Sequence, residues 1–264
     1  MFLDAIDRKI RKSFSDAAFQ YDLLSSLHKE IGRELSRKVI DNDQVAHILD
    51  IGMGTGWLTN RLSFFLPDSL IVGLDFAPGM VNTAKKKWED IKVIQANAGV
   101  LPFKGKSFDL IVSNLAYQWI HDLDRTFRGN YEVLNDGGKI YLTAFGFNTF
   151  KELFHSFEQT RSGSRISGAA FRRLPSLDDM TRGIEKAGFK KIKSDYEIIK
   201  VHFPDMIGLI KWIKDIGANV LNHELIVRKQ WLERAGRFYE ENYKDRFSIY
   251  ATFEVIWLEG VKEI

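Results

Sequence analysis

Short apolar runs alternate with helix-like segments between residues 46 and 145, and this alternation predicts an α/β protein. Each run is rich in Ile, Leu and Val, as expected for strands buried on both faces of a parallel sheet. The right-handed crossovers that such units require place the intervening helices on the two faces. The expected strands are residues 48–51, 70–75, 91–96, 107–114 and 139–145.

The segments on either side of this core follow other patterns. Residues 4–40 place apolar side chains at spacings of three and four, which predicts a short helix followed by a longer one. After residue 147 the alternation stops, and Ser176 with Asp179 three residues later indicates a capped helix start. The remaining pattern predicts strands over 190–203 and 247–258, and helices over 150–160, 206–221 and 228–242.

Composition narrows the classes of function. The 264 residues include no cysteine, which excludes disulfides, thiolate metal sites and a cysteine nucleophile. The six histidines show no metal-ligand spacing, and a net charge of +3 gives no reason to expect nucleic acid as a partner. No apolar run approaches the roughly 18–20 residues of a membrane span. We therefore expect a cytoplasmic protein with no metal and no membrane partner.

A glycine loop follows the first expected strand. Gly52, Gly54 and Gly56 occupy alternate positions directly after Asp50 and Ile51, and a helical pattern resumes at residue 57. Glycine permits positive φ and a close approach of a ligand to the backbone. A strand, a glycine loop and a helix N-terminus together predict a nucleotide-cofactor site. A tight turn with a purely structural purpose is the alternative for the triplet taken alone.

Polar residues also end the later strands. Asp75 lies about 20 residues after the glycine loop, where a carboxylate can accept hydrogen bonds from both hydroxyls of a ribose. The same acid could cap the helix that starts near Pro78, and the two roles are compatible. Asn97 and Asn114 follow the next two strands. Ligands of such sheets bind at the carboxyl ends of the strands, so these positions favour the cofactor interpretation.

Four stretches, DIGMGTG, GLDFAPGM, FDLIVSNLAYQW and NDGGKIYLTAF, resemble successive motifs of the class I S-adenosylmethionine (SAM) methyltransferases. The resemblance implies a Rossmann-like seven-stranded sheet of order 3-2-1-4-5-7-6 with strand 7 antiparallel, and SAM as cofactor. Asn97 stands where the family usually has an aspartate facing adenine, and its side-chain oxygen can still accept a hydrogen bond. The implied cofactor-binding residues are Asp50, Gly52, Gly54, Gly56, Asp75, Phe76, Met80, Asn97, Ala98, Asn114 and Leu115.

A closer resemblance extends over most of the chain. FSDAAFQYD at 14–22, SNLAYQW at 113–119, RRLPSLDDM at 172–180 and IKDIGAN at 213–219 are similar to the BioC family, the malonyl-acyl-carrier-protein O-methyltransferases of biotin synthesis. This resemblance implies a helical N-terminal lid over 1–42 and a methyltransferase domain over 43–264. Within that domain it implies an inserted cap over about 147–190 and a further helical segment over about 205–243. The implied substrate is malonyl-acyl-carrier protein or malonyl-CoA, and we expect a monomer.

The implied chemistry needs no general base, because a malonyl carboxylate is already ionised at pH 7. It does need a positive partner for that carboxylate, and arginine offers a bidentate one. We expect Arg172 in this role, with Arg173 as the alternative. Tyr21 would close over the cofactor and donate to the carboxylate, while Gln118 and Trp119 would line the pocket.

Two other functions remain open from the sequence. The chain could be a class I methyltransferase for a quinone, phenol or amine, in which case a base such as His121 would matter. It could also be a non-catalytic SAM-binding partner. An acidic carrier protein would meet a basic surface, and the candidate surface comprises the arginines of 161–173 with Arg182, Lys186, Lys190 and Lys191.

Overall fold

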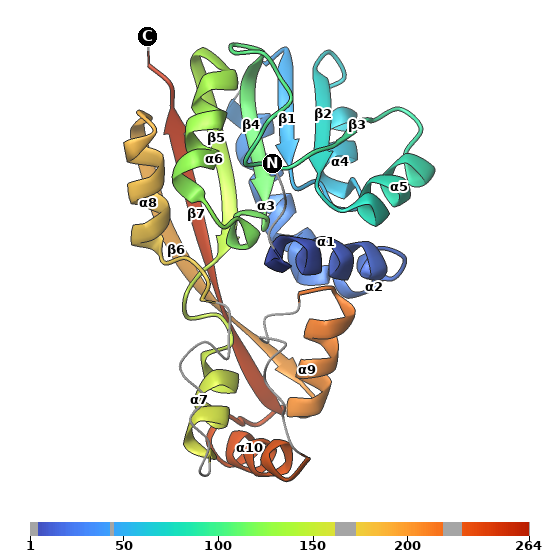
Figure 1. Cartoon of the computed structure of the whole chain (residues 1–264), viewed down its shortest axis with the longest axis vertical. Coiled ribbons are helices and arrows are strands. Elements are labelled where there is room, and N and C mark those ends of the chain that lie inside the picture. The colour runs from blue at the N-terminus through green and yellow to red at the C-terminus, as the bar shows by residue number, and fades with distance from the viewer. Residues whose placement is uncertain (1–4, 43–44, 162–172, 219–228, 264) are drawn as a thin grey trace.

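A computed structural model describes residues 5–42, 45–161, 173–218 and 229–263. Three helices come first: α1 (Ala5–Ala17), α2 (Tyr21–Leu24) and α3 (Ser26–Asn42). The parallel part of the sheet follows, in which helices alternate with strands as the sequence predicts (Figure 1). Its elements are β1 (His47–Ile51), α4 (Trp57–Phe65), β2 (Leu70–Asp75), α5 (Pro78–Lys87), β3 (Lys92–Gln95), β4 (Phe108–Asn114), α6 (Leu123–Val133) and β5 (Leu134–Phe145).

The remaining elements are α7 (Lys151–Gln159), α8 (Leu177–Lys186), β6 (Lys190–Phe203), α9 (Met206–Asp215), α10 (Lys229–Asn242) and β7 (Ile249–Val261). The seven strands form one sheet of order β3-β2-β1-β4-β5-β7-β6. Neighbouring strands from β3 to β5 pair in parallel, and β7 pairs antiparallel with both β5 and β6. The fold class, sheet order and strand direction expected from the sequence are confirmed.

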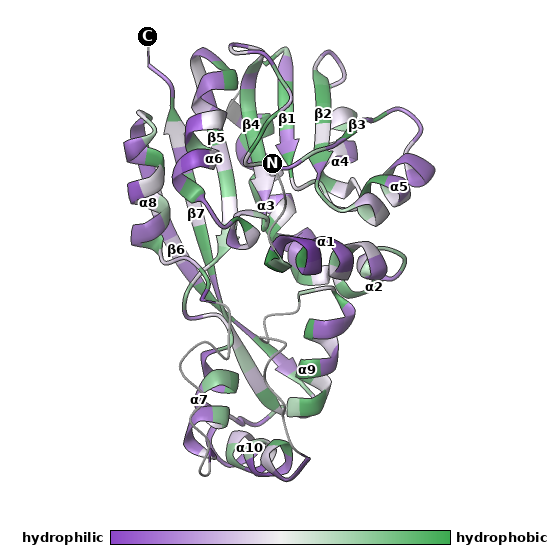
Figure 2. Cartoon of the chain, in the orientation of Figure 1, coloured by the Kyte–Doolittle hydropathy of each residue, from purple (hydrophilic) through white to green (hydrophobic). Residues whose placement is uncertain are grey.

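Both faces of the central strands β1 and β4 are buried, which explains their continuous apolar runs. Ile48 packs with Leu35 of α3 and Leu62 of α4 on one face. The next residue, Leu49, packs on the opposite face with Phe127 of α6 and the side chains of α8. Since successive strand residues point to opposite faces, both positions must be apolar. Figure 2 shows the corresponding contrast between hydrophobic strands and the hydrophilic outer surfaces of α1 and α8.

The last two strands extend beyond the rest of the sheet. β5 pairs with β7 only as far as Phe145 opposite Val255, whereas β6 and β7 stay paired as far as Phe203 opposite Ile249. This two-stranded arm carries a lobe of α7, α9 and α10, and the apolar cluster of the lobe continues to Ile31 of α3 and Phe145 of β5 (Figure 1). Helix α8 lies elsewhere, against α6 on the sheet face.

Several local details differ from the sequence expectation. The N-terminal segment forms three helices, not two, and α9 ends at Asp215, six residues early. The turn expected at 136–138 lies within β5, where the pairing with β4 shifts register. The capped start of α8 is confirmed, because Ser176 and Asp179 form a reciprocal capping box. In the described ranges, no helix combines the length and apolarity of a membrane span, and no three His, Asp or Glu side chains cluster as metal ligands.

Candidate functional site

The glycine loop after β1 adopts a conformation that requires glycine. Gly52, Gly54 and Gly56 all have positive φ, at 75°, 58° and 80°. A Cβ atom on Gly52 would lie 2.2 Å from the Cβ of Ala116. The Gly54 N–H donates to Asp75 Oδ2 at 2.9 Å. The loop is thus fixed by its own backbone, and its open side is available to a ligand.

Two buried carboxyl groups face this loop. Asp75 also accepts a hydrogen bond from the Ala77 N–H at 2.8 Å, and burial raises the pKa of its carboxyl to about 6. Asp50 accepts from Thr59 Oγ1 at 2.7 Å, while its Oδ1 is buried with no partner among the described residues. Burial raises the pKa of Asp50 to about 7. Unsatisfied buried acceptors are costly, so this site fits a ligand that brings hydrogen-bond donors or positive charge.

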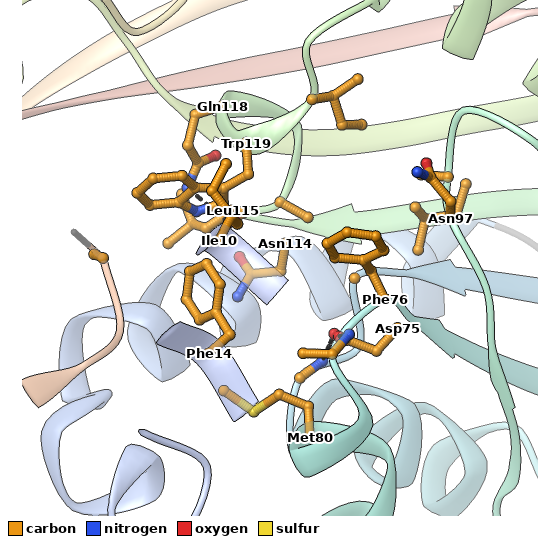
Figure 3. A pocket seen from close by; sticks show the side chains of 18 of the residues that line it. Ile10, Phe14, Asp75, Phe76, Met80, Asn97, Asn114, Leu115, Gln118 and Trp119 are labelled. Atoms are coloured by element: carbon orange, nitrogen blue, oxygen red, sulfur yellow. Dashed lines mark hydrogen bonds between the residues drawn. The ribbon is translucent and has the colours of Figure 1, made fainter. Parts of the chain in front are cut away.

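A cavity of about 210 Å³ lies between the carboxyl ends of the strands and the helices α1 to α3. Figure 3 shows Asp75, Phe76, Met80 and Asn97 on one side of it, and Phe14, Gln118 and Trp119 on the other. The structure therefore brings together most of the residues predicted for the site. Those that line the cavity are Tyr21, Gly52, Gly54, Asp75, Phe76, Met80, Asn97, Ala98, Asn114, Leu115, Gln118 and Trp119.

The segment after β4 is held by side chains that hydrogen-bond to backbone. Leu115 has a φ of 54°, an uncommon conformation for a residue with a side chain. The Gln118 amide donates to the Leu115 carbonyl at 2.7 Å and accepts from the Phe145 N–H at 3.4 Å. Asn114 donates to the His28 carbonyl at 2.9 Å and accepts from Thr143 Oγ1 at 2.9 Å. Gln118 and Asn114 therefore fix the wall of the cavity.

Asn97 also makes a backbone contact. Its Oδ1 accepts the Gly99 N–H at 2.8 Å, which stabilises the turn after β3. A carbonyl oxygen has two lone pairs, so this oxygen could accept one further hydrogen bond. Asn97 therefore offers a polar ligand a side-chain acceptor in addition to the Asp75 carboxylate.

Aromatic rings enclose the opposite side. Phe14 of α1 packs edge-on against Trp119, with ring centroids 5.3 Å apart. Burial raises the pKa of the Tyr21 phenol, and the nearby carboxylates of Asp75 and Asp22 raise it further. The phenol is therefore neutral at pH 7 and serves as a hydrogen-bond donor. This side of the cavity suits an apolar group that ends in an acceptor.

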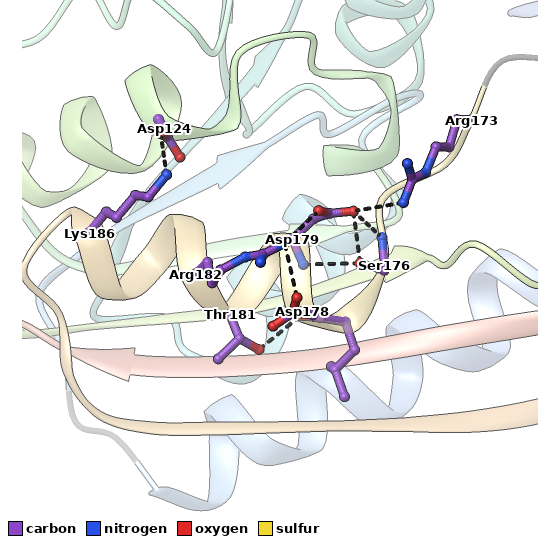
Figure 4. A network of polar contacts seen from close by, with 9 residues as sticks. Asp124, Arg173, Ser176, Asp178, Asp179, Thr181, Arg182 and Lys186 are labelled. Atoms are coloured by element: carbon purple, nitrogen blue, oxygen red, sulfur yellow. Dashed lines mark hydrogen bonds and ion pairs between the residues drawn. The ribbon is translucent and has the colours of Figure 1, made fainter.

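Some predicted residues lie elsewhere. Gly56 is the N-cap of α4, and a Cβ there would contact Trp88 and Ile91, not the cavity. Asp50 lines a smaller neighbouring cavity beneath the glycine loop. Arg172 lies outside the described residues. Arg173 is exposed, with its guanidinium 4.0 Å from Asp179 Oδ2 (Figure 4). The guanidinium also lies above the ring of Phe147.

The candidate basic surface is partly neutralised. Arg182 pairs with Asp178 at 2.9 Å, and Lys186 pairs with Asp124 at 3.0 Å (Figure 4). Lys191 pairs with Glu263 at 3.1 Å. Exposed ion pairs contribute little free energy and exchange readily, so these cations could still contact an acidic partner.

The residues that line the cavity but were not predicted as site residues include His28, Phe145 and Trp212. One signal for His28 was present. It lies three residues before Ile31 and seven before Leu35, on the apolar face of α3. A polar residue on such a face is worth testing as a site residue.

The chain was compared with known proteins. A methyltransferase domain model matches residues 49–142. The malonyl-acyl-carrier-protein O-methyltransferase of Geobacter sulfurreducens is 32% identical, over 96% of this chain and 98% of that protein. The YcgJ protein of Bacillus subtilis aligns with a TM-score of 0.62 at 17% identity, over 88% of this chain and 99% of that one. Phosphoethanolamine N-methyltransferase 2 of Haemonchus contortus, solved with S-adenosyl-L-methionine, aligns with a TM-score of 0.58 at 18% identity. The alignment covers 95% of this chain and 57% of that one.

The sheet order, the glycine loop after β1 and the carboxylate after β2 define a class I methyltransferase with SAM as its cofactor. The expected cofactor and enzyme class are thereby confirmed. The similarity to the Geobacter protein covers 96% of this chain and therefore extends well beyond the parallel part of the sheet. The chain belongs to the malonyl-acyl-carrier-protein O-methyltransferase family.

Proposed function

We propose that this protein transfers the methyl group of SAM to the free carboxylate of a malonyl group carried on acyl carrier protein. The observation that carries the proposal is the similarity to the Geobacter sulfurreducens enzyme over 96% of the chain. That similarity includes the segments that bound the substrate side of the cavity. The use of the product in biotin synthesis rests on the sequence resemblance alone.

We assign the cofactor to the side of the cavity formed by β1, β2 and β3. The Asp75 carboxylate would accept the ribose hydroxyls, the free oxygen of Asp50 would accept from the ammonium group, and the Asn97 oxygen would accept from the adenine amine. Gly52 and Gly54 would let the ligand approach the backbone. Bound SAM supplies a methyl group on a positively charged sulfur, and the residues of this chain supply its position.

The substrate side fits a nucleophile that needs no deprotonation. A malonyl carboxylate is ionised at pH 7, and Tyr21 is a neutral donor that would orient it. Gln118 would act indirectly, because both ends of its amide hold backbone atoms. Phe14 and Trp119 would exclude water from the reacting atoms. Orientation and exclusion of water are together sufficient for an in-line transfer between preformed charges.

We further propose that residues 1–42 act as a lid and that the lobe of α7, α9 and α10 acts as a cap. Helices α1 and α2 lie across the carboxyl ends of the strands (Figure 1). Trp212 of α9 donates from its indole to the Leu24 carbonyl at 3.2 Å, so the lobe contacts the lid directly. The carboxylate partner expected at Arg172 remains a prediction.

Radiolabelled SAM with purified protein tests the proposal. Malonyl-acyl-carrier protein, malonyl-CoA and a panel of phenols are offered in parallel, and the product is identified by mass. We expect a malonyl methyl ester, formed fastest on the carrier protein. Faster turnover of malonyl-CoA would instead identify coenzyme A as the carrier of the malonyl group.

Acetyl-acyl-carrier protein is the matched control substrate, because it lacks the free carboxylate. Label in acetyl-carrier protein or only in a phenol would refute the proposal. SAM binding without transfer to any of these acceptors would instead support a non-catalytic role.

A further inference from the structure

His28 is a cavity residue to which the cofactor contacts proposed above give no role. It lies in the first turn of α3 and lines both the main cavity and the smaller neighbouring cavity that Asp50 also lines. Its ring is enclosed by three aromatic rings: Phe145 with centroids 5.5 Å apart, Tyr21 at 5.8 Å and Trp212 at 6.3 Å. Its Nδ1 atom is buried and has no hydrogen-bond partner among the described residues.

The surroundings of His28 favour an anion. The side-chain hydroxyl of Ser25, just before α3, lines the smaller cavity with His28 and is also buried without a partner in the described part of the chain. The N-terminal end of a helix carries partial positive charge. The nearby carboxylate of Asp22 is already compensated, because it accepts from Thr55 Oγ1 at 3.0 Å and pairs with Lys87 at 2.6 Å and Lys29 at 3.4 Å. A second carboxylate could therefore approach this end of α3 without meeting an uncompensated charge from Asp22.

We propose that His28 binds the substrate carboxylate through a ring N–H, beside the hydroxyl of Tyr21. This inference rests on the proposed function and assigns a carboxylate-binding residue within the described chain. It also explains why a polar ring lies among apolar side chains, since the ligand would satisfy a nitrogen that the protein leaves without a partner.

A neutral donor suits this reaction. Burial lowers the pKa of His28 to about 4, so the free ring is uncharged at pH 7 and carries one N–H donor. Such a donor fixes the carboxylate but leaves its negative charge available for attack on the methyl group. A fully charged partner, such as the arginine expected from the sequence, would stabilise the reactant more than the transition state, in which that charge is being lost; a neutral His28 donor is the alternative to that expectation. The ester product is uncharged and a weaker acceptor, which favours its release.

Three substitutions of His28 test the inference. His28→Leu removes both ring nitrogens, His28→Asn retains an amide near the Nδ1 position, and His28→Gln retains one near Nε2. For His28→Leu we expect the KM for the malonyl thioester to rise about ten-fold or more, as loss of a hydrogen bond to a charged group implies. The dissociation constant of SAM should stay within about two-fold, because this contact is to the other substrate. One of the two amide variants should return KM to within about three-fold of the wild type, depending on which nitrogen carries the donor.

His155→Leu is the matched control, since this exposed histidine pairs with Tyr243 on the far lobe. This control should leave the KM for the malonyl thioester and the dissociation constant of SAM unchanged. An unchanged KM in His28→Leu, a larger effect on SAM than on the thioester, or failure of both amides to restore KM would overturn the inference alone. A wild-type protein that forms no malonyl ester would refute the proposed function and this inference together.

Discussion

Replacing Gly52 by alanine tests whether the glycine loop is fixed as the structure indicates. Two independent costs arise at this position. A φ of 75° lies in the left-handed region, which costs a residue with a Cβ about 1–2 kcal/mol. The new methyl carbon would also lie 2.2 Å from the Cβ of Ala116, well inside van der Waals contact, and relieving such an overlap costs about 1–3 kcal/mol.

The two costs sum to about 2–5 kcal/mol of unfolding free energy. For a domain of this size that lowers the melting temperature by roughly 4–20 °C. The displaced loop should also weaken SAM binding, because the backbone after β1 moves away from the ligand. Thermal unfolding followed by circular dichroism and calorimetric titration with SAM measure the two effects.

Two other glycines provide matched controls. At Gly54 a Cβ would meet only the Tyr21 ring, at 3.9 Å, so Gly54→Ala should show the strain cost without the overlap. Gly129 within α6 has open space around it, and Gly129→Ala should stabilise the helix by up to about 1 kcal/mol. A Gly52→Ala protein as stable as the Gly54→Ala protein would refute the overlap, and one as stable as Gly129→Ala would refute both costs.

Three further predictions concern the cofactor side and the fold. SAM should bind more weakly as the pH falls through about 6, because protonated Asp75 loses acceptor capacity. In Asp75→Asn the dissociation constant of SAM should depend on the binding of one proton fewer over this pH range. If the pH dependence is unchanged in this variant, the Asp75 carboxyl is not its cause. Asn97→Asp should tighten SAM binding about five-fold at pH 7.5, since a hydrogen bond to a charged acceptor is stronger by about 1 kcal/mol. Weaker SAM binding by this variant in calorimetric titration would contradict the proposed contact. Ser176→Ala breaks the capping box of α8 and should lower the melting temperature by about 2–4 °C with SAM affinity unchanged; an unaltered melting curve would show that the cap contributes nothing.

The cofactor side could be predicted because each of its parts follows directly from a short stretch of sequence. Gly52, Asp75 and Asn114 each come at the end of a buried strand. In a parallel sheet these ends lie at one edge, so residues far apart in the chain had to meet. The strand order itself came from the family resemblance, since apolar runs do not specify which strands are neighbours.

The substrate side could not be predicted in the same way. The environment of His28 depends on Phe145 at the end of β5 and on Trp212, which reaches it because the β6–β7 arm carries α9 back to the N-terminal helices. Long-range packing of this kind leaves no periodic signal in the chain. Arg173 shows the converse: an arginine in a promising motif lies beside Asp179 and Phe147 because the Ser176 cap draws that segment onto α8.

Hydrogen bonds join the N-terminal helices to the glycine loop and to the end of β4, and these contacts bear on how the proposed reaction would proceed without a base. The Asn114 amide donates to the His28 carbonyl at 2.9 Å, and Thr55 Oγ1 donates to Asp22 at 3.0 Å. These contacts connect α3 to the end of β4 and α2 to the glycine loop. Because a methyl transfer needs its reacting atoms about 3–3.5 Å apart and in line, both ligands must be positioned by one rigid frame. Under the proposed function, Tyr21 and His28 would hold the carboxylate from helices that are hydrogen-bonded to the glycine loop, and positional accuracy would take the place of acid–base chemistry.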